Sequence, residues 1–236
     1  MLFNKVPPTT HRRGFIGAIA AGAASLGLAS LLPQRLNAEP LAKTNHEIVD
    51  PESPDAWFGQ IKGKHRIIFD ATHPEGLMPF AWPRIFLITN GKTGSLPKDC
   101  SVVVVLRHSA IPFAFDSSLW KKYKFGESFK INDPATKAPA ERNAFWQPAK
   151  GDFSVPGLGE VPLGINELQA DGVLFCVCDM AITTHTAAMA AELKVDAAEL
   201  KKEWLAAVLP GIMVAPSGVW AVGRAQEHGC AYCFVG

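Results

Sequence analysis

The chain has 236 residues, with 23 Lys and Arg, 22 Asp and Glu, and a formal net charge of +1. Residues 1–38 hold four of the bases and no acid, so the other 198 residues carry 19 bases, 22 acids and a formal charge of −3. This balance argues against a protein that binds nucleic acid or anionic membranes through a strongly basic surface. The length suffices for one sizeable domain.

Residues 1–38 have the pattern of an export signal. The segment HRRGFIG at 11–17 contains a twin-arginine pair, an apolar run of about 15 residues follows, and Ala38 ends a candidate cleavage site. The run is short of the roughly 20 residues that span a membrane. We expect twin-arginine (Tat) export to the periplasm and no membrane span after signal removal, with an uncleaved anchor as the alternative. Residues 39–54 are polar and proline-punctuated, which predicts a tether before a domain at 55–236.

Within the domain, apolar runs predict strands that alternate with helices. Four consecutive valines in SVVVVLRH, at 101–108, show no alternation, which is typical of a parallel strand covered on both faces. The predicted strands are 65–71, 101–108, 173–179, 212–215 and 230–235. Helices are expected at 55–63 (or a turn), 77–90, 164–172, 183–194, 196–208 and 217–228, with caps at Asp196, Ser217 and Gly229. The fold class is α/β: one domain with an open sheet of about five mostly parallel strands and helices on both faces.

Residues 109–163 interrupt this alternation. They contain six prolines, four glycines and nine aromatic side chains. A segment of this length without clear elements is functional or disordered, and its aromatic content indicates that it packs on something. We predict a lid or an interface arm.

Five cysteines occur, namely Cys100, Cys176, Cys178, Cys230 and Cys233. An odd number in an exported protein leaves at least one thiol free, shared between chains or used in chemistry.

The C-terminal third resembles the DsrE/DsrF/YchN-like superfamily. The resemblance rests on DGVLFCVCDMA at 171–181 and on LPGIMVAPSGVWAVGRAQEHGCAYCFV at 209–235, and the KGKHR, FDA and PEG segments resemble a Tat-exported subgroup. It implies an α/β sheet that assembles as trimers or hexamers. It also implies a strand-ending cysteine, here Cys178, that passes sulfane sulfur as a persulfide between partner proteins.

Cys178 ends the apolar run VLFCVC before a helix, where the helix N-terminus favours a reactive thiolate. The alternative is a buried, inert strand cysteine. Cys176 lies two residues earlier on the same face of the strand, and we expect it to pack in the core.

His73, His108 and His185 each follow a predicted strand end or lie in the next turn. Together with Asp70 and Asp179 they are candidates for one edge of the sheet. There His108 or His73 would assist the thiol as a base, or His73, His108, His185 and Cys178 would form a metal site. Arg107 is a candidate partner for an anion, although an arginine before a turn is more often a surface residue.

Two other patterns give weaker predictions of a binding site. CVC and CAYC suggest a four-thiolate zinc site, but an intervening strand would keep the pairs about 10 Å apart, too far for zinc. Ser217 and Gly218 open a helix at a strand end and are candidates for binding an anion through backbone N–H groups, the simpler role being an N-cap.

Two functions follow as expectations. The first is an exported sulfur carrier that uses Cys178 in exchange with a donor or acceptor protein, without a cofactor and as a carrier rather than a turnover enzyme. The second is a periplasmic oligomeric binding module that holds a metal, cofactor or small ligand at the His/Cys edge of the sheet.

Overall fold

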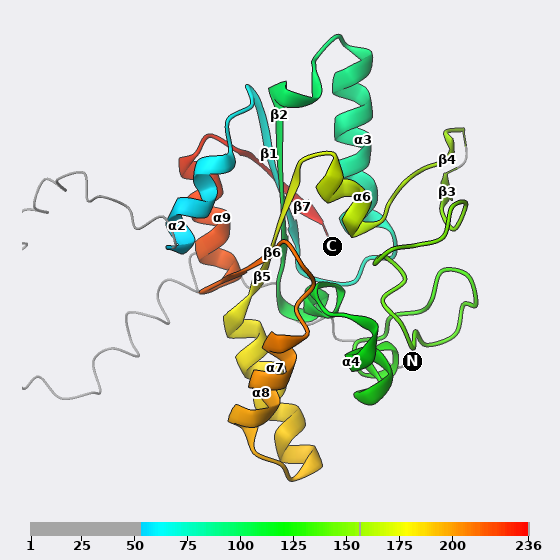
Figure 1. The fold of residues 1–236 in the computed structure, drawn as a ribbon, viewed down its shortest axis with the longest axis vertical. Helices are drawn as coiled ribbons and strands as arrows, with labels where there is room; N and C mark the ends of the chain where they lie inside the picture. Colours follow the sequence, from blue (N-terminus) through cyan, green and yellow to red (C-terminus); the bar gives the residue numbers. More distant parts are fainter. Residues whose placement is uncertain (1–52, 156, 236) are drawn as a thin grey trace, which may run out of the picture. The chain divides into compact units, whose positions relative to one another are not determined.

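The computed structural model describes residues 53–155 and 157–235, which belong to one compact unit, Ile48–Gly236. At its centre is a sheet of five parallel strands in the order β6-β5-β2-β1-β7 (Figure 1). The strands are β1 His65–Ala71, β2 Cys100–Leu106, β5 Val173–Cys178, β6 Ile212–Ala215 and β7 Ala231–Val235. The predicted fold class is therefore confirmed. The predictions of a signal at 1–38 and, up to residue 52, of a tether lie outside the described residues.

The order of the strands explains why helices cover both faces. The chain steps from β1 to β2, β5 and β6 in one direction, so right-handed crossovers place their helices on one face. The last crossover returns past three strands to β7, and its helix α9, Gly218–Glu227, lies on the opposite face. Figure 1 shows α9 on one side of the sheet and α3, Met78–Lys92, with α6, Ile165–Ala170, on the other.

Each face of the sheet has its own core. On the first face, Phe69, Val104, Phe175 and other side chains form a large cluster with the helices that follow β1, β2 and β5. On the second face, a smaller cluster joins five sheet residues to α9 and to the N-terminal segment, with members that include Ile68, Val103, Val105, Cys176, Ala215, Ala221, Ala225 and Phe58. Phe58 of the N-terminal segment is fully buried there.

The N-terminal segment consists of α2, Pro54–Trp57, and the 3-10 turn η1, Phe58–Gln60. The Ser53 hydroxyl accepts a hydrogen bond from the Ala56 amide at 3.2 Å and caps α2. The first described helix thus begins at Pro54, next to the predicted domain boundary at residue 55.

The predicted caps are confirmed. The Asp196 carboxylate accepts the Ala198 and Glu199 amides at 2.9 Å and begins α8, Ala197–Ala206, which packs on α7, Asp179–Leu193. The Ser217 hydroxyl accepts the Trp220 amide at 3.2 Å at the start of α9, and Gly229 follows that helix with a φ of 82°. In the first crossover, α3 continues through Pro83 to Lys92, and the 3-10 turn η2, Pro97–Asp99, leads into β2.

Aromatic side chains of residues 109–163 belong to the core on the first face, so the expected packing of this segment is confirmed, and its role as a lid or an interface arm stays a prediction. The segment contains short elements: η3 His108–Ala114, α4 Ser117–Lys122, α5 Phe125–Ser128, and the hairpin of β3 Ser154–Val155 with β4 Gly159–Glu160. Phe145 is central to its packing, because its ring stacks on Phe80 of α3 at 4.1 Å and on Phe153 at 5.0 Å between centroids. The aromatic content was the correct signal, and the partner is the protein's own sheet.

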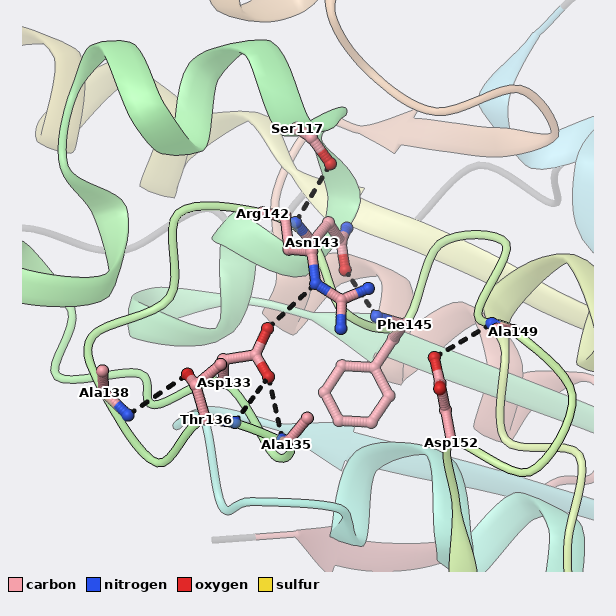
Figure 2. Close-up of polar contacts among 10 residues, drawn as sticks. All are labelled: Ser117, Asp133, Ala135, Thr136, Ala138, Arg142, Asn143, Phe145, Ala149 and Asp152. Atoms are coloured by element: carbon pink, nitrogen blue, oxygen red, sulfur yellow. Dashed lines mark hydrogen bonds and ion pairs between the residues drawn. The ribbon is translucent and has the colours of Figure 1, made fainter.

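Side-chain hydrogen bonds to the backbone replace regular structure within this segment (Figure 2). Asn143 is 1% exposed, and its amide group donates to the Phe113 and Phe115 carbonyls at 2.9 Å each. Asp133 accepts the Ala135 amide at 2.8 Å and Arg142 Nε at 2.9 Å. Burial alone would raise the pKa of Asp133, but the amides of Ala135 and Thr136, with Arg142, lower it below its ordinary value.

A search of the helices in the described part of the chain finds none that is long and apolar enough to cross a membrane.

Candidate functional site at the carboxyl edge of the sheet

All five strands are parallel, so the residues that follow them meet at one edge. Arg107 and His108 follow β2, Asp179 follows β5, and Ser217 lies two residues beyond the end of β6. The Arg107 amide donates to the Ala71 carbonyl at 3.0 Å, which continues the pairing of β2 with β1 past the end of both strands. Such an edge is where open α/β sheets place their reactive groups.

Cys178 is both the last residue of β5 and the N-cap of α7. Its Sγ accepts a hydrogen bond from the Ala181 amide at 3.3 Å, the role that a serine or threonine oxygen usually has. The helix therefore begins at Asp179, four residues before the predicted start at residue 183. The thiol lies at the positive end of a 15-residue helix, where a thiolate is stabilised, and it is 6% exposed.

Arg107 supplies a positive charge beside this thiol. Its Nε and Nη2 donate to the two carboxylate oxygens of Asp70 at 2.6 and 2.8 Å, and the Tyr232 hydroxyl donates to the same carboxylate at 2.8 Å. The hydrogen bond that Arg107 donates to Asp70 is the main cause that raises the pKa of Arg107, and the charge of a Cys178 thiolate adds to it. Arg107, a candidate partner for an anion, pairs here with the carboxylate of Asp70, which is only 1% exposed and depends on this pair.

Cys176 differs from Cys178 although only one residue separates them. It is fully buried in the cluster beneath α9, and burial, followed by the nearby Cys178 and Asp70, raises the pKa of its thiol. Its expected packing role is confirmed. All five cysteines are free, so the two are not joined by a disulfide.

The three histidines lie in a row at this edge. The ring centroids of His73 and His108 are 5.1 Å apart, those of His108 and His185 are 6.4 Å apart, and His185 lies 4.9 Å from Phe129. Burial, followed by the charge of His108, lowers the pKa of His185. His108 has a φ of 52°, a left-handed conformation that costs a non-glycine residue roughly 1–2 kcal/mol and that is common at functional sites.

Neither expected carboxylate contacts a histidine. Asp70 is occupied by Arg107 and Tyr232, and Asp179 forms an ion pair with Lys201 of α8 at 2.8 Å. Among residues 53–155 and 157–235, no group of three or more His, Cys, Asp or Glu is placed to hold a metal ion. The alternative metal site of His73, His108, His185 and Cys178 is thus not assembled in this structure.

Two pockets share this edge, and His185 lines both. The first, of about 720 Å³, is lined by residues that include Cys178, Arg107, His108, Ser217 and Gly218, and we call it the Cys178 pocket. The second, of about 620 Å³, is lined by residues that include His73, Phe129, Ser128 and Lys130. The histidine row therefore runs from the Cys178 pocket into its neighbour, and His73 belongs only to the latter.

Ser217 and Gly218 place the start of α9 against Arg107. A Cβ atom added at Gly218 would lie 2.6 Å from both Cβ and Cδ of Arg107, so only glycine allows this approach. Since Ser217 caps the Trp220 amide, the simpler predicted role of N-cap is confirmed. Both residues also line the Cys178 pocket.

The C-terminal cysteines lie elsewhere. Two strands, β2 and β1, separate β5 from β7, one more than expected, which places the two cysteine pairs about 14 Å apart across the sheet. Burial raises the pKa of Cys230 to about 11, an effect that Arg66 partly offsets. A shared zinc site is excluded by this spacing, as the sequence argument expected.

Tyr232 is the member of the site that sequence reasoning missed. The CAYC pattern gives no role to this tyrosine, yet its hydroxyl completes the hydrogen bonds of Asp70, 162 residues earlier in the chain. The available signal was Asp70 itself, a charged residue at the end of the apolar run HRIIF that requires partners if it is buried.

Comparisons with known proteins give little for this chain. No family model and no curated protein matches it. A solved structure from Methanobacterium thermoautotrophicum, the protein of unknown function MTH1491, is similar with a TM-score of 0.38 and 16% identity. The similarity covers 72% of this chain and 99% of that one.

Proposed function

We propose that the protein is an exported DsrE-like carrier that holds sulfane sulfur as a persulfide on Cys178. The placement of Cys178 carries this proposal: its Sγ accepts the Ala181 amide at the start of α7, and it lines a pocket with Arg107 and His108. A helix N-terminus and a nearby cation are the surroundings that favour a reactive thiolate. The sequence resemblance to the DsrE/DsrF/YchN-like superfamily supports the same residue.

The chemistry needs only sulfur exchange. The Cys178 thiolate attacks a sulfane sulfur of a polysulfide, a new S–S bond forms at Cys178, and the shortened polysulfide leaves with the electron pair of the broken S–S bond. An acceptor thiolate then attacks the outer sulfur and releases Cys178 as a thiolate. His108, which lines the same pocket, would accept the thiol proton. His73, whose ring centroid lies 5.1 Å from that of His108, would support this transfer.

A carrier also needs an entrance for its partner. Met180 and Val219 flank the Cys178 pocket and are 55% and 67% exposed. Exposed apolar side chains around a reactive residue suit docking of a donor or acceptor protein. Assembly as a trimer or hexamer and Tat export to the periplasm belong to the same proposal and rest on the sequence alone.

Intact-mass spectrometry after incubation with polysulfide tests the proposal. We expect the protein to gain sulfur in 32 Da steps, about the mass of one sulfur atom, and Cys178→Ser to lose this gain. Cys176→Ser is the matched control, because it removes a thiol from the same strand that is fully buried. Uptake that persists in Cys178→Ser, or no uptake by the unaltered protein, would reject the carrier role.

The second candidate is a binding module. The row of histidines between two pockets favours it, because imidazole side chains there face space for a small ligand. Under this alternative the protein would keep a small ligand through purification, and polysulfide would leave Cys178 unchanged. Native mass spectrometry of the purified protein separates the two candidates.

A further inference from the structure

Arg107 has a free edge beside the reactive thiol. Asp70 occupies Nε and Nη2, and Nη1 has no hydrogen-bond partner among the described residues. The side chain is 27% exposed and lines the Cys178 pocket. The guanidinium group thus binds Asp70 with one edge and keeps a donor free on the other.

The group that holds Arg107 is itself buried and well connected. The Asp70 side chain is 2% exposed and accepts three hydrogen bonds, two from Arg107 and one from Tyr232. Gly218 lets α9 pack directly on the aliphatic part of Arg107. These contacts fix the guanidinium in one orientation before any ligand arrives.

The rest of the pocket adds no negative side chain. Its ionisable lining residues are Arg107, His108, His185 and Cys178, with no Asp or Glu. Asp179, the nearest acid in sequence to Cys178, is neutralised by Lys201. The start of α9 also lines the pocket at Gly218 and Val219, where helix amides without an intrahelical acceptor favour negative charge.

We propose that Arg107, held in place by Asp70 and Tyr232, recognises the negative charge of the compound that reacts with Cys178. The pocket would then select anionic sulfur compounds, such as carboxylated disulfides and polysulfides, over neutral or cationic ones. This inference rests on the proposed function, because it names the class of compound that Cys178 meets.

Thiol–disulfide exchange with three matched reagents tests the selectivity. The Cys178 thiolate attacks one sulfur of the reagent, a mixed disulfide forms, and the other half leaves as a thiolate that takes up the proton lost by Cys178. The reagents are dithiodipropionate (anionic), bis(hydroxyethyl) disulfide (neutral) and cystamine (cationic). Mass spectrometry of the Cys178 peptide gives each rate in a Cys100→Ser background, which removes a partly exposed competing thiol.

We expect the anionic reagent to react about tenfold faster than the neutral one and the cationic reagent to react more slowly, the scale of one charge-assisted hydrogen bond. In Arg107→Gln the ratio of anionic to neutral rates should fall to about one. The ratio of rates is the readout because removing Arg107 also changes the reactivity of the Cys178 thiol. That change affects the rates with all three reagents alike. Lys98→Gln, on the exposed turn before β2, is the control for an equal loss of charge and should keep the ratio.

Arg107→Gln leaves Asp70 without its cation and could fail to fold, so Asp70→Asn/Arg107→Gln provides a neutral pair for the same test. A ratio that stays near tenfold in either folded variant overturns the proposal, as does a ratio near one, or no reaction with any reagent, in the unaltered protein. The assay does not require stored sulfur. A charge preference without polysulfide uptake would therefore reject the carrier role while retaining the selectivity.

Discussion

The two edges of the sheet hold one thiol each, buried at Cys178 and partly buried at Cys100, in opposite electrostatic surroundings. At the carboxyl edge, Cys178 receives a helix amide and lies near the Arg107 cation. At the amino edge, Cys100 opens β2, and burial together with the charge of Asp99 raises the pKa of its thiol. The difference follows from topology, because parallel strands lead into helix N-termini at one edge only.

The ion pairs at the two edges differ in which partner is buried. At the carboxyl edge the acid is buried, with the Asp70 side chain 2% exposed and Arg107 27% exposed. At the amino edge the base is buried, with the Arg84 side chain 8% exposed and Asp171 50% exposed. The amino-edge pocket of Arg84 and Cys100 also contains the half-exposed carboxylate of Asp171, whereas the Cys178 pocket contains Arg107 and no Asp or Glu.

Removing the exposed partner of the carboxyl-edge pair should have the largest effect. Arg107→Leu leaves the Asp70 carboxylate buried without a cation, and we expect the free energy of unfolding to fall by about 3–5 kcal/mol in urea titrations. Adding Asp70→Asn should restore most of this loss. Arg224→Leu, whose partners Asp55 and Glu227 are 48% and 63% exposed, is the control and should cost less than about 1 kcal/mol. A loss below about 1 kcal/mol for Arg107→Leu would contradict the role assigned to the pair.

Substitutions at two glycines of α9 test whether Arg107 needs its observed position, with smaller expected effects on stability. Gly218→Ala places a methyl group against Arg107, so we expect a loss of about 1–3 kcal/mol and several-fold slower sulfur uptake at Cys178. Gly223→Ala on the same helix meets nothing within 4 Å and should stabilise the helix by about 0.5–1 kcal/mol with unchanged uptake. Equal effects of the two variants on uptake would show that Arg107 does not need its observed position.

The smallest expected effect concerns pH. The pKa of His185 is lowered in the folded protein, so the folded state binds fewer protons than the unfolded chain once the pH falls below about 6.5. The associated stability is present above that pH and is lost as the pH falls toward the folded pKa. His185→Gln should therefore flatten the decline of the unfolding free energy between about pH 6.5 and 5. An unchanged slope in His185→Gln would argue against a lowered pKa for this half-buried imidazole.

The sheet was predictable because its signals are local. Runs such as SVVVVLRH and VLFCVC identify buried parallel strands without any knowledge of their neighbours. The start of α7 was missed because a cysteine serves as the cap, and the usual N-cap residues are Ser, Thr, Asp and Asn. The short elements within residues 109–163 were not predictable, because their order comes from aromatic packing and from hydrogen bonds of Asn143 and Asp133, which leave no periodic pattern.

The candidate site was predictable only where the carboxyl edge follows from strand order. That rule brought Cys178, His108 and His185 to one pocket. It did not show which charges would pair, because the network of Asp70, Arg107 and Tyr232 joins three strands across 162 residues and depends on side-chain reach. Strand order places residues at an edge, and contacts between strands determine their charge environment.

The most direct test of this account maps sulfur onto individual cysteines of the unaltered protein. After brief exposure to limiting polysulfide, alkylation and proteolysis, mass spectrometry reports the persulfide content of each cysteine peptide. Residues 171–181 contain Cys176 and Cys178 together, so fragmentation must distinguish these two. We expect sulfur to accumulate on Cys178, although Cys100 at the other edge is the more exposed thiol. Sulfur on Cys100 at an equal or higher level would show that exposure governs reactivity and would contradict the central role of the carboxyl edge.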